Sequence, residues 1–478
     1  MCDDKSDNRD KIHQKAADHL RKRHGISLKD GPAHSRHHQL NRRNFLRMSG
    51  LAALGGGMLL QGVPVSAFSP APLLASLNTA DCGDRILVLI RLKGGNDGLN
   101  TIVPFQDDEY YNIRPTLAIP RTDLWTLNDE FGMPNYMSEL QPFWEEGRMR
   151  VVHNVGYPRP NYSHFRSSDI WASASDSEEI ISTGWMGRWL DNEFPAFADA
   201  PPTIPPALQI GVQANMIFRS AGTNMALSIS NPAEFYQIAQ SGQLYNTTGL
   251  GNTPAADELA FVRTVSNSAF RYAEQIQLAY QNGRNDAAYP ELYPASYLGE
   301  QLAIVARLIK GRLGTRIFMV SIDGFDTHAE QVDAHPALLN ALSSTVKAFY
   351  DDLRKDGFAK EVVSMTFSEF GRTIFENGSE GTDHGTGGPM LIFGEEIGQG
   401  FHGTHPNLRD VDQYGDPLFD VDFRQVYATV LQDWLCVPSE VSDFTLGQPF
   451  DKIDGIVPTG NPPVGANDNA ALLGHNTS

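Results

Sequence analysis

Five short runs of the chain are mainly apolar, without the alternation of polar positions that marks a half-exposed strand. They span residues 85–92, 150–155, 316–322, 361–367 and 389–393. Continuous apolar and β-branched runs are typical of strands buried on both faces of a parallel sheet. Helical periodicity occupies four longer segments, 258–281, 296–311, 336–355 and 423–435. Strands that alternate with helices predict an α/β fold, with a mostly parallel central sheet and helices on both faces.

The rest of the chain differs in composition from these elements. Residues 195–253 are rich in Pro, Gly, Ser and Asn, and we predict inserted loops over one end of the sheet. Residues 455–478 contain few apolar side chains, which predicts a disordered tail. Because no linker clearly divides the stretch between the termini, we expect residues 68–454 to form one α/β domain.

The N-terminal region has the layout of an export signal. The pair Arg42-Arg43 precedes Phe45-Leu46, and an uncharged run follows from Met48 to Phe68. A paired arginine before a short apolar segment is typical of the twin-arginine route, which exports folded proteins. The run is too rich in glycine for a membrane span, which needs about 20 strongly apolar residues. The small residues Val65-Ser66-Ala67 suit cleavage by a signal peptidase.

We therefore expect residues 1–67 to be a twin-arginine signal peptide with a long polar leader. The expected partner during export is the twin-arginine translocase. The mature protein would be periplasmic or secreted, without stable insertion into the membrane.

Charge and cysteine content exclude several classes of function. Residues 1–67 hold 12 of the 38 basic and 6 of the 57 acidic residues, so their removal leaves a net charge of −25. A chain this acidic repels nucleic acid. Only Cys82 and Cys436 then remain, too few for an iron–sulfur cluster or a thiolate zinc site. In an oxidising compartment they could form a disulfide, but their separation in sequence favours two separate thiols.

Polar clusters follow the predicted strands, and they contain most of the residues with catalytic or metal-binding chemistry. The clusters are KGGNDGLN, NYSHFRSSD, DGFDTH and SEFGRT, the last followed by TDHG. Their candidate residues are Asp97, Ser163, His164, Asp326, His328, Glu369, Arg372, Asp383 and His384. In parallel sheets, ligands gather at the carboxyl ends of the strands. Imidazoles and carboxylates gathered there are the ligand set of zinc, manganese or a similar ion.

Each of these residues also has a purely structural interpretation. Asp97 would fit a tight turn, and Asp326 an Asx turn or a helix cap. Glu369 and Arg372, one helical turn apart, would make a surface ion pair, or else a metal ligand or base with an anion-binding guanidinium. Taken singly, the aspartates favour the structural interpretation. The coincidence of four clusters at matched strand ends favours a metal site.

Ser163 is the best candidate for a nucleophile in these clusters. Adjacent residues on a loop rarely face each other, so we expect His164 to be a metal ligand and not the base for Ser163. Ser167 and Ser168 compete with Ser163 for the role. Capping of the helix that follows is an equally good explanation of these hydroxyls.

With these motifs the chain resembles domain-of-unknown-function family 1501. The shared features are the twin-arginine leader and the segments LKGGNDGLNTIVP, SHFRSSDIW, GWMGRWLD, DGFDTH, TFSEFGRT and GTDHGTGGPMLIFG, over about residues 42–450. That family in turn resembles the alkaline phosphatase and sulfatase superfamily. The resemblance implies an alkaline-phosphatase-like fold, and metal ligands at Asp97, Asp326, His328, Asp383 and His384. It implies a nucleophile near Ser163 and lets Glu369 take the place of a strand-end aspartate.

The sequence therefore predicts an exported, metal-dependent hydrolase of phosphate or sulfate esters. Its cofactor would be one or two divalent ions, zinc, manganese or calcium, and its substrate a small anionic ester. No sulfatase nucleophile motif is present. This absence favours the alternative, a catalytically inactive secreted protein that keeps the fold for binding or assembly.

Overall fold

The computed structural model describes residues 82–458 apart from 198–200, 212–213, 222, 241–244, 247–248, 251–253, 285–291 and 413–414. It also describes two short strands, β1 (Met58–Leu60) and β2 (Val63–Val65), which pair antiparallel. Otherwise the predicted signal peptide lies outside the described residues, as does the tail beyond 458. Residues 84–459 form one compact unit, separate from residues 1–83 and 460–478. None of the described helices is both long and apolar enough to cross a bilayer.

A nine-stranded sheet forms the centre of the larger unit. Its order is β14–β6–β13–β10–β3–β9–β7–β8, and β15 also pairs with β6. The strands are β3 (Ile86–Lys93), β6 (Met149–Gly156), β7 (Ala207–Ile210), β8 (Ala226–Ile229), β9 (Ile317–Asp323), β10 (Val362–Phe367), β13 (Gly388–Gly394), β14 (Gly400–His402) and β15 (Val421–Asp422). All neighbours are parallel except β13, which is antiparallel to both β10 and β6. The predicted mixed α/β class with a mostly parallel sheet is confirmed.

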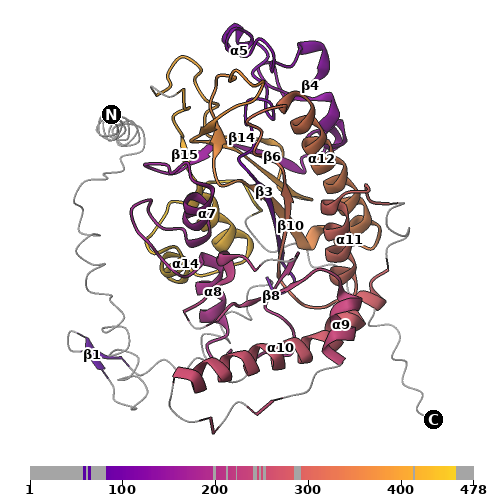
Figure 1. The fold of residues 1–478 in the computed structure, drawn as a ribbon, viewed down its shortest axis with the longest axis vertical. Coiled ribbons are helices and arrows are strands. Elements are labelled where there is room, and N and C mark those ends of the chain that lie inside the picture. Colours follow the sequence, from indigo (N-terminus) through magenta and orange to yellow (C-terminus); the bar gives the residue numbers. More distant parts are fainter. Residues whose placement is uncertain are drawn as a thin grey trace. The chain divides into compact units, whose positions relative to one another are not determined.

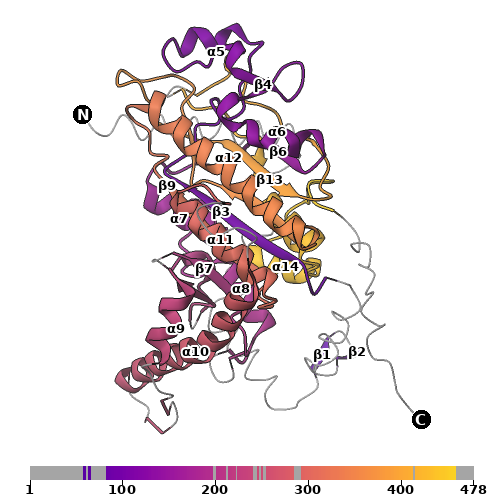
Figure 2. The ribbon, with the colours of Figure 1, turned by 90° about the vertical axis from the view of Figure 1, so that its right-hand side faces the viewer.

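Helices cover both faces of the sheet, as Figures 1 and 2 show. The long helices are α10 (Pro254–Asn282), α11 (Tyr297–Lys310) and α12 (Gln331–Lys355). The shorter ones are α5 (Asp108–Ile113), α6 (Gln141–Glu145), α7 (His164–Ser173), α8 (Trp185–Glu193), α9 (Pro232–Gln240), α13 (Phe423–Thr429), continued by one π-helical turn to Trp434, and α14 (Ser439–Leu446). Small hairpins pair β4 (Leu124–Thr126) with β5 (Gly132–Pro134) and β11 (Gly371–Arg372) with β12 (His384–Gly385).

Strand β3 divides its side chains between two hydrophobic cores. Val88 and Ile90 face a core built with α11 and α12, while Leu87 and Leu89 face one built with α7, α8 and α13. All four side chains are fully buried. Burial on both faces explains why this strand reads as an uninterrupted apolar run.

The segment 195–253, expected as inserted loops, contributes regular structure. It supplies β7 and β8, which extend the sheet beyond β9 by parallel pairing, and helix α9. Each of these strands has only four residues, which is too short for a recognisable pattern of apolar and polar positions in the sequence. Cys82 and Cys436 are both disulfide-bonded, and the expectation of separate thiols was wrong.

The strand directions bring the polar clusters to one edge of the sheet. The parallel strands β10, β3 and β9 are adjacent, and all three end at this edge. Because β13 is antiparallel to β10, it starts where they end. The segment that carries His384 therefore reaches the same edge from the amino side of its strand. This accounts for the long spacing between Glu369 and Asp383.

Candidate metal centre

Three loops deliver four side chains to one point above the carboxyl edge of the sheet. His164 opens helix α7 after β6, and Asp326 and His328 lie in the loop after β9. His384 lies in the β11–β12 hairpin, where it pairs with Arg372. The sequence therefore predicted correctly that these clusters share one edge.

The Nε2 atoms of all three imidazoles lie within hydrogen-bond distance of the Asp326 carboxylate. Nε2 of His164 is 3.2 Å from Oδ2 of Asp326. On the other carboxylate oxygen, Oδ1, the Nε2 atoms of His384 and His328 lie at 3.1 and 3.2 Å. The two Nε2 atoms of His328 and His384 are themselves only 2.9 Å apart. His164, Asp326 and His384 offer ligand atoms that all lie within 4.8 Å of one another.

Each imidazole is held through its other ring nitrogen by an oxygen acceptor. Nδ1 of His164 lies 3.1 Å from the Glu369 carboxylate, and Nδ1 of His328 lies 3.1 Å from that of Asp383. Nδ1 of His384 lies 2.7 Å from the main-chain oxygen of Tyr162. An acceptor at Nδ1 fixes the proton there and leaves the Nε2 lone pair free, which is the arrangement of metal-bound histidines. All three Nε2 atoms lie 3.1 to 3.2 Å from a carboxylate oxygen of Asp326.

Asp326 carries the negative charge of the centre. Burial raises the pKa of its carboxyl, but the hydrogen bond and positive charge of Arg372, together with the nearby His384 ring, outweigh this and lower the pKa to about 2. Burial lowers the pKa of His384, which keeps that imidazole neutral near pH 7. The hydrogen bond to Glu369 raises the pKa of His164. Because a cation binds an ionised carboxylate and neutral imidazoles, the raised pKa of His164 makes metal binding compete with a proton on that ring.

Arg372 braces the loops of the centre. Nε donates to the oxygen of Gly95 (2.8 Å) and Nη1 to that of Thr382 (2.9 Å). Nη2 donates to Asp326 Oδ1 (2.8 Å) and to the oxygens of Gly94 and Phe325. The guanidinium is fully buried and every nitrogen has an acceptor. Arg372 therefore orients Asp326 and is not placed to bind a substrate anion, contrary to the expected role.

Glu369 is a buried carboxylate that supports His164. Its side chain is 1% exposed, and Oε1 also accepts the main-chain N–H of Gly94 at 3.0 Å. Burial raises the pKa of Glu369, but His164, Arg91 and the Gly94 amide outweigh this and lower it. The carboxylate thus orients the imidazole, which is a different role from the catalytic base predicted as one possibility.

Asp383 and Ser163 lie next to the centre. Oδ1 of Asp383 accepts from His328 and from Asn377 (3.2 Å), so this carboxylate orients a histidine where a direct ligand was expected. Ser163 is exposed at the N-cap of α7, and its side chain makes no capping hydrogen bond. It lies between Tyr162 and His164, both of which contact the centre.

The structure does not bring Asp97 into this cluster. Its side chain is 1% exposed and pairs with the guanidinium of Arg114, Nη1 to Oδ2 at 2.5 Å and Nη2 to Oδ1 at 3.0 Å. Gln331 donates to the same carboxylate at 2.5 Å. Burial raises the pKa of Asp97, and Arg114 reverses the effect and lowers it. Asp97 is an ion-pair partner where a first metal ligand was predicted.

Three contributors to the site were absent from the sequence prediction. The main-chain oxygen of Tyr162 orients His384, and a main-chain group leaves no side-chain signature. Asn377 donates to Asp383 and to the oxygen of His328. Gln331, three residues after His328, accepts the hydroxyls of Thr327 and Thr382. Only its position in the post-strand cluster could have identified it.

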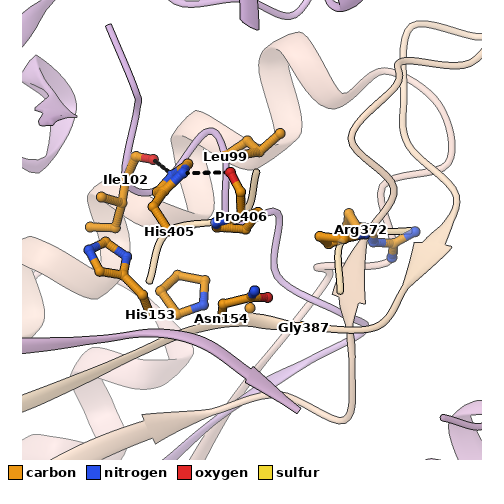
Figure 3. Close-up of a pocket in the computed structure, with 12 residues that line it drawn as sticks. Leu99, Ile102, His153, Asn154, Arg372, Gly387, His405 and Pro406 are labelled. Carbon is orange, nitrogen blue, oxygen red and sulfur yellow. Dashed lines mark hydrogen bonds between the residues drawn. The ribbon is translucent and has the colours of Figure 1, made fainter. Parts of the chain in front are cut away.

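Two further buried histidines lie in a neighbouring pocket, shown in Figure 3. His153, Asn154 and His405 line it together with Arg372. The ring nitrogens of His405 face the oxygens of Ile102 (3.1 Å) and Pro406 (3.3 Å). Burial lowers the pKa of His405 to about 4 and that of His153 well below its ordinary value. These imidazoles are neutral and lie among aromatic rings, as core histidines do.

Fold and site together define an α/β protein with a candidate His/Asp metal centre at the carboxyl edge of its sheet. A family model described as Protein of unknown function (DUF1501) matches residues 153–457. The match covers more than half of the chain, which therefore belongs to that family. All four side chains of the centre lie inside the matched region, and Asp97 lies before it. No curated protein matches the chain.

Several solved structures are similar, all at low identity. A protein in the alkaline phosphatase superfamily from Vibrio parahaemolyticus has 10% identity and a TM-score of 0.31, with 78% of this chain and 71% of that one covered. The PsFucS1 sulfatase from Pseudoalteromonas sp. has 10% identity and a TM-score of 0.35, with 82% of this chain and 75% of that one covered. The alkaline phosphatase from the Antarctic bacterium TAB5 has 11% identity and a TM-score of 0.30, with 67% of this chain and 94% of that one covered. At such scores the likeness assigns neither residues nor an activity.

Proposed function

We propose that the protein is a metal-dependent hydrolase of small phosphate or sulfate esters. One observation carries the proposal: three imidazoles, each held at Nδ1 by an oxygen acceptor, direct their Nε2 atoms to one carboxylate. A structural histidine cluster has no need to leave three lone pairs facing one another. The Nε2 atoms of His328 and His384 lie 2.9 Å apart, and a divalent cation between the imidazoles would remove the repulsion between their lone pairs.

The donor set favours some metals over others. His164, His328, His384 and Asp326 supply up to three nitrogens and one or two oxygens, which suits zinc or manganese. Calcium prefers six to eight oxygen ligands and fits this set poorly. An ion held here supplies Lewis acidity toward an anionic ester.

The chain's own residues supply the other parts of such a reaction. The exposed hydroxyl of Ser163, at the start of α7, is the candidate nucleophile, and a water in the same place is the other option. Glu369 and Asp383 keep their imidazoles in the binding tautomer. Arg372 holds Asp326 ionised and fixed in place.

We also propose that the protein acts outside the inner membrane. Arg42-Arg43 and the short apolar run after it support export by the twin-arginine translocase. That route fits a centre built from several loops, because such a site forms only once the chain has folded. The strong negative charge of the chain repels the phosphate backbone and makes nucleic acid an unfavourable partner.

The first test is elemental analysis of the purified protein beside an Asp326→Ala/His384→Ala variant. We expect stoichiometric zinc or manganese in the wild type and at least a tenfold lower content in the variant. Asp323→Ala is the matched control, because Asp323 lies at the end of the same strand but pairs with the exposed Lys93. Hydrolysis of aryl phosphate and aryl sulfate esters, with and without a chelator, then tests the reaction.

One observation favours the alternative of a binding protein that has lost catalysis. Every nitrogen of the Arg372 guanidinium is engaged by main-chain oxygens or by Asp326, so this group is not offered to an anion. Metal bound at the centre without hydrolysis of any tested ester would support this alternative. A wild type that contains no metal after incubation with zinc and manganese would contradict the metal-dependent proposal itself.

A further inference from the structure

Gln331, the first residue of α12, lies buried one layer behind the candidate metal centre. Its side-chain nitrogen donates to Oδ2 of Asp97 at 2.5 Å. Its side-chain oxygen accepts two hydroxyls, from Thr327 at 3.0 Å and from Thr382 at 2.7 Å. These three partners come from three different loops at the edge of the sheet.

Both threonines lie within two residues of a side chain of the centre. Thr327 separates Asp326 from His328, and Thr382 lies two residues before His384. The N–H of Thr382 also donates to the main-chain oxygen of Thr327 at 3.1 Å. The amide oxygen of Gln331, together with this main-chain bond, therefore joins the two loops whose imidazoles lie 2.9 Å apart.

The other end of the Gln331 amide is fixed by a buried ion pair. Asp97 is held by Arg114, which also donates to the oxygens of Thr373 (2.9 Å) and Ile374 (2.7 Å). The N–H of Thr373 in turn donates to the oxygen of Asp383 at 3.0 Å. The network thus returns to the loop of His384 from a second direction.

We infer that Gln331 is a positioning residue, whose amide fixes the loops of Asp326 and His384 at metal-binding distance through Thr327, Thr382 and Asp97. This inference rests on the proposed function. The position requires a donor on one side and an acceptor on the other. A glutamate there would place a carboxylate oxygen against Asp97, and an apolar side chain would leave buried hydroxyls without an acceptor.

The test measures Co²⁺ affinity by competition and records the visible absorption spectrum of the Co²⁺ form. We expect Gln331→Glu and Gln331→Met to bind Co²⁺ roughly 10- to 100-fold more weakly than the wild type, the range for residues that orient metal ligands, and to show an altered spectrum. The matched control is Gln301→Met. Gln301 is an equally buried glutamine that bonds Tyr297 and Ser321 within the α11–β9 layer. It should lower the melting temperature and leave Co²⁺ affinity unchanged.

A second pair of variants keeps the inference testable if the Gln331 variants do not fold. Thr382→Val removes one hydroxyl and should weaken Co²⁺ binding, whereas Thr382→Ser keeps the hydroxyl and should bind as the wild type does. Wild-type Co²⁺ affinity and spectrum in folded Gln331→Glu and Gln331→Met, or equal binding by the two Thr382 variants, would overturn the positioning role alone. Failure of the wild type to bind Co²⁺ would overturn the proposed function and this inference with it.

Discussion

At the scale of single residues, the centre depends on which atom of each side chain is already engaged. Both carboxylate oxygens of Asp326 face imidazole Nε2 atoms. In Asp383, by contrast, Oδ1 accepts hydrogen bonds from His328 Nδ1 and from Asn377. Two aspartates that look alike in the sequence therefore have different roles. One has the geometry of a ligand, and the other orients a ligand.

This difference predicts unequal losses of metal affinity. We expect Asp326→Asn to reduce zinc affinity by more than 1,000-fold, because it removes the only carboxylate at the centre of the described cluster. Asp383→Asn should reduce it by only about 10- to 100-fold, since an amide oxygen still accepts from His328. Competition titration with a zinc chelator measures both, with Asp323→Asn as control. Equal losses in the two variants would mean that Asp383 is itself a ligand.

The same scale shows why the sequence could not assign every residue. A sequence motif gives the type and spacing of Asp97 but not its partner. That partner, Arg114, lies 17 residues further on in a segment without a chemical signature, and it claims both carboxylate oxygens. The Asp-x-His pattern was informative for the opposite reason, because Asp326 and His328 are brought together by local chain geometry.

At the scale of elements, the centre depends on how closely the turns after adjacent strands approach. Gly94 follows β3 with φ +123°, and a Cβ there would lie 2.3 Å from the main-chain nitrogen of Asp326. The turn after β3 thus packs directly on the loop after β9. Glycine at this position lets Asp326 sit against the sheet edge.

We predict that Gly94→Ala displaces Asp326 and lowers zinc affinity at least tenfold. It should also lower the free energy of unfolding by more than the roughly 1 kcal/mol that a left-handed backbone costs a non-glycine residue. Gly357→Ala is the matched control, because Gly357 has φ +81° with open space around it. Zinc titration and urea unfolding of both variants distinguish the backbone strain of a positive φ, which both share, from the clash of the new Cβ with Asp326, which only Gly94→Ala introduces. Similar results for the two would show that the close approach is unimportant.

The elements themselves were largely predictable from the apolar pattern, and their directions were not. Burial on both faces marks β3, β6, β9, β10 and β13 equally, although β13 runs antiparallel to its neighbours. Direction depends on the length and path of the connection, and the β11–β12 hairpin that reverses the chain before β13 pairs only two residues on each side. Strands β7 and β8 were missed because four residues carry too little pattern.

At the scale of the whole molecule, the sheet separates two large cores, and the polar edge is the place where charged groups meet. Beside that edge, burial keeps His405 neutral. Figure 3 shows its ring between the oxygens of Ile102 and Pro406. Protonating this buried ring is less favourable in the folded protein than in the unfolded one. The free energy of unfolding therefore depends on pH.

The direction of that link follows from the lowered pKa of His405. Its pKa is about 4 in the folded protein and 6.5 as the ordinary value, so unfolding takes up a proton between these two pH values. The contribution to stability is complete above pH 6.5 and is lost as the pH falls toward 4. For this group alone, the free energy of unfolding should be about 2 kcal/mol lower at pH 5 than at pH 7.5.

The variant His405→Phe isolates this contribution. Phenylalanine keeps the stacking on Phe131 (4.8 Å between ring centroids) and removes the titrating group. The variant loses a donor to the oxygen of Ile102, so we expect lower stability than the wild type at pH 7.5. Its stability should nevertheless fall by about 2 kcal/mol less than that of the wild type between pH 7.5 and pH 5, measured by urea unfolding. Equal falls in the two proteins would show that the ring is already charged in the folded state, and that the paired carbonyl oxygens outweigh burial.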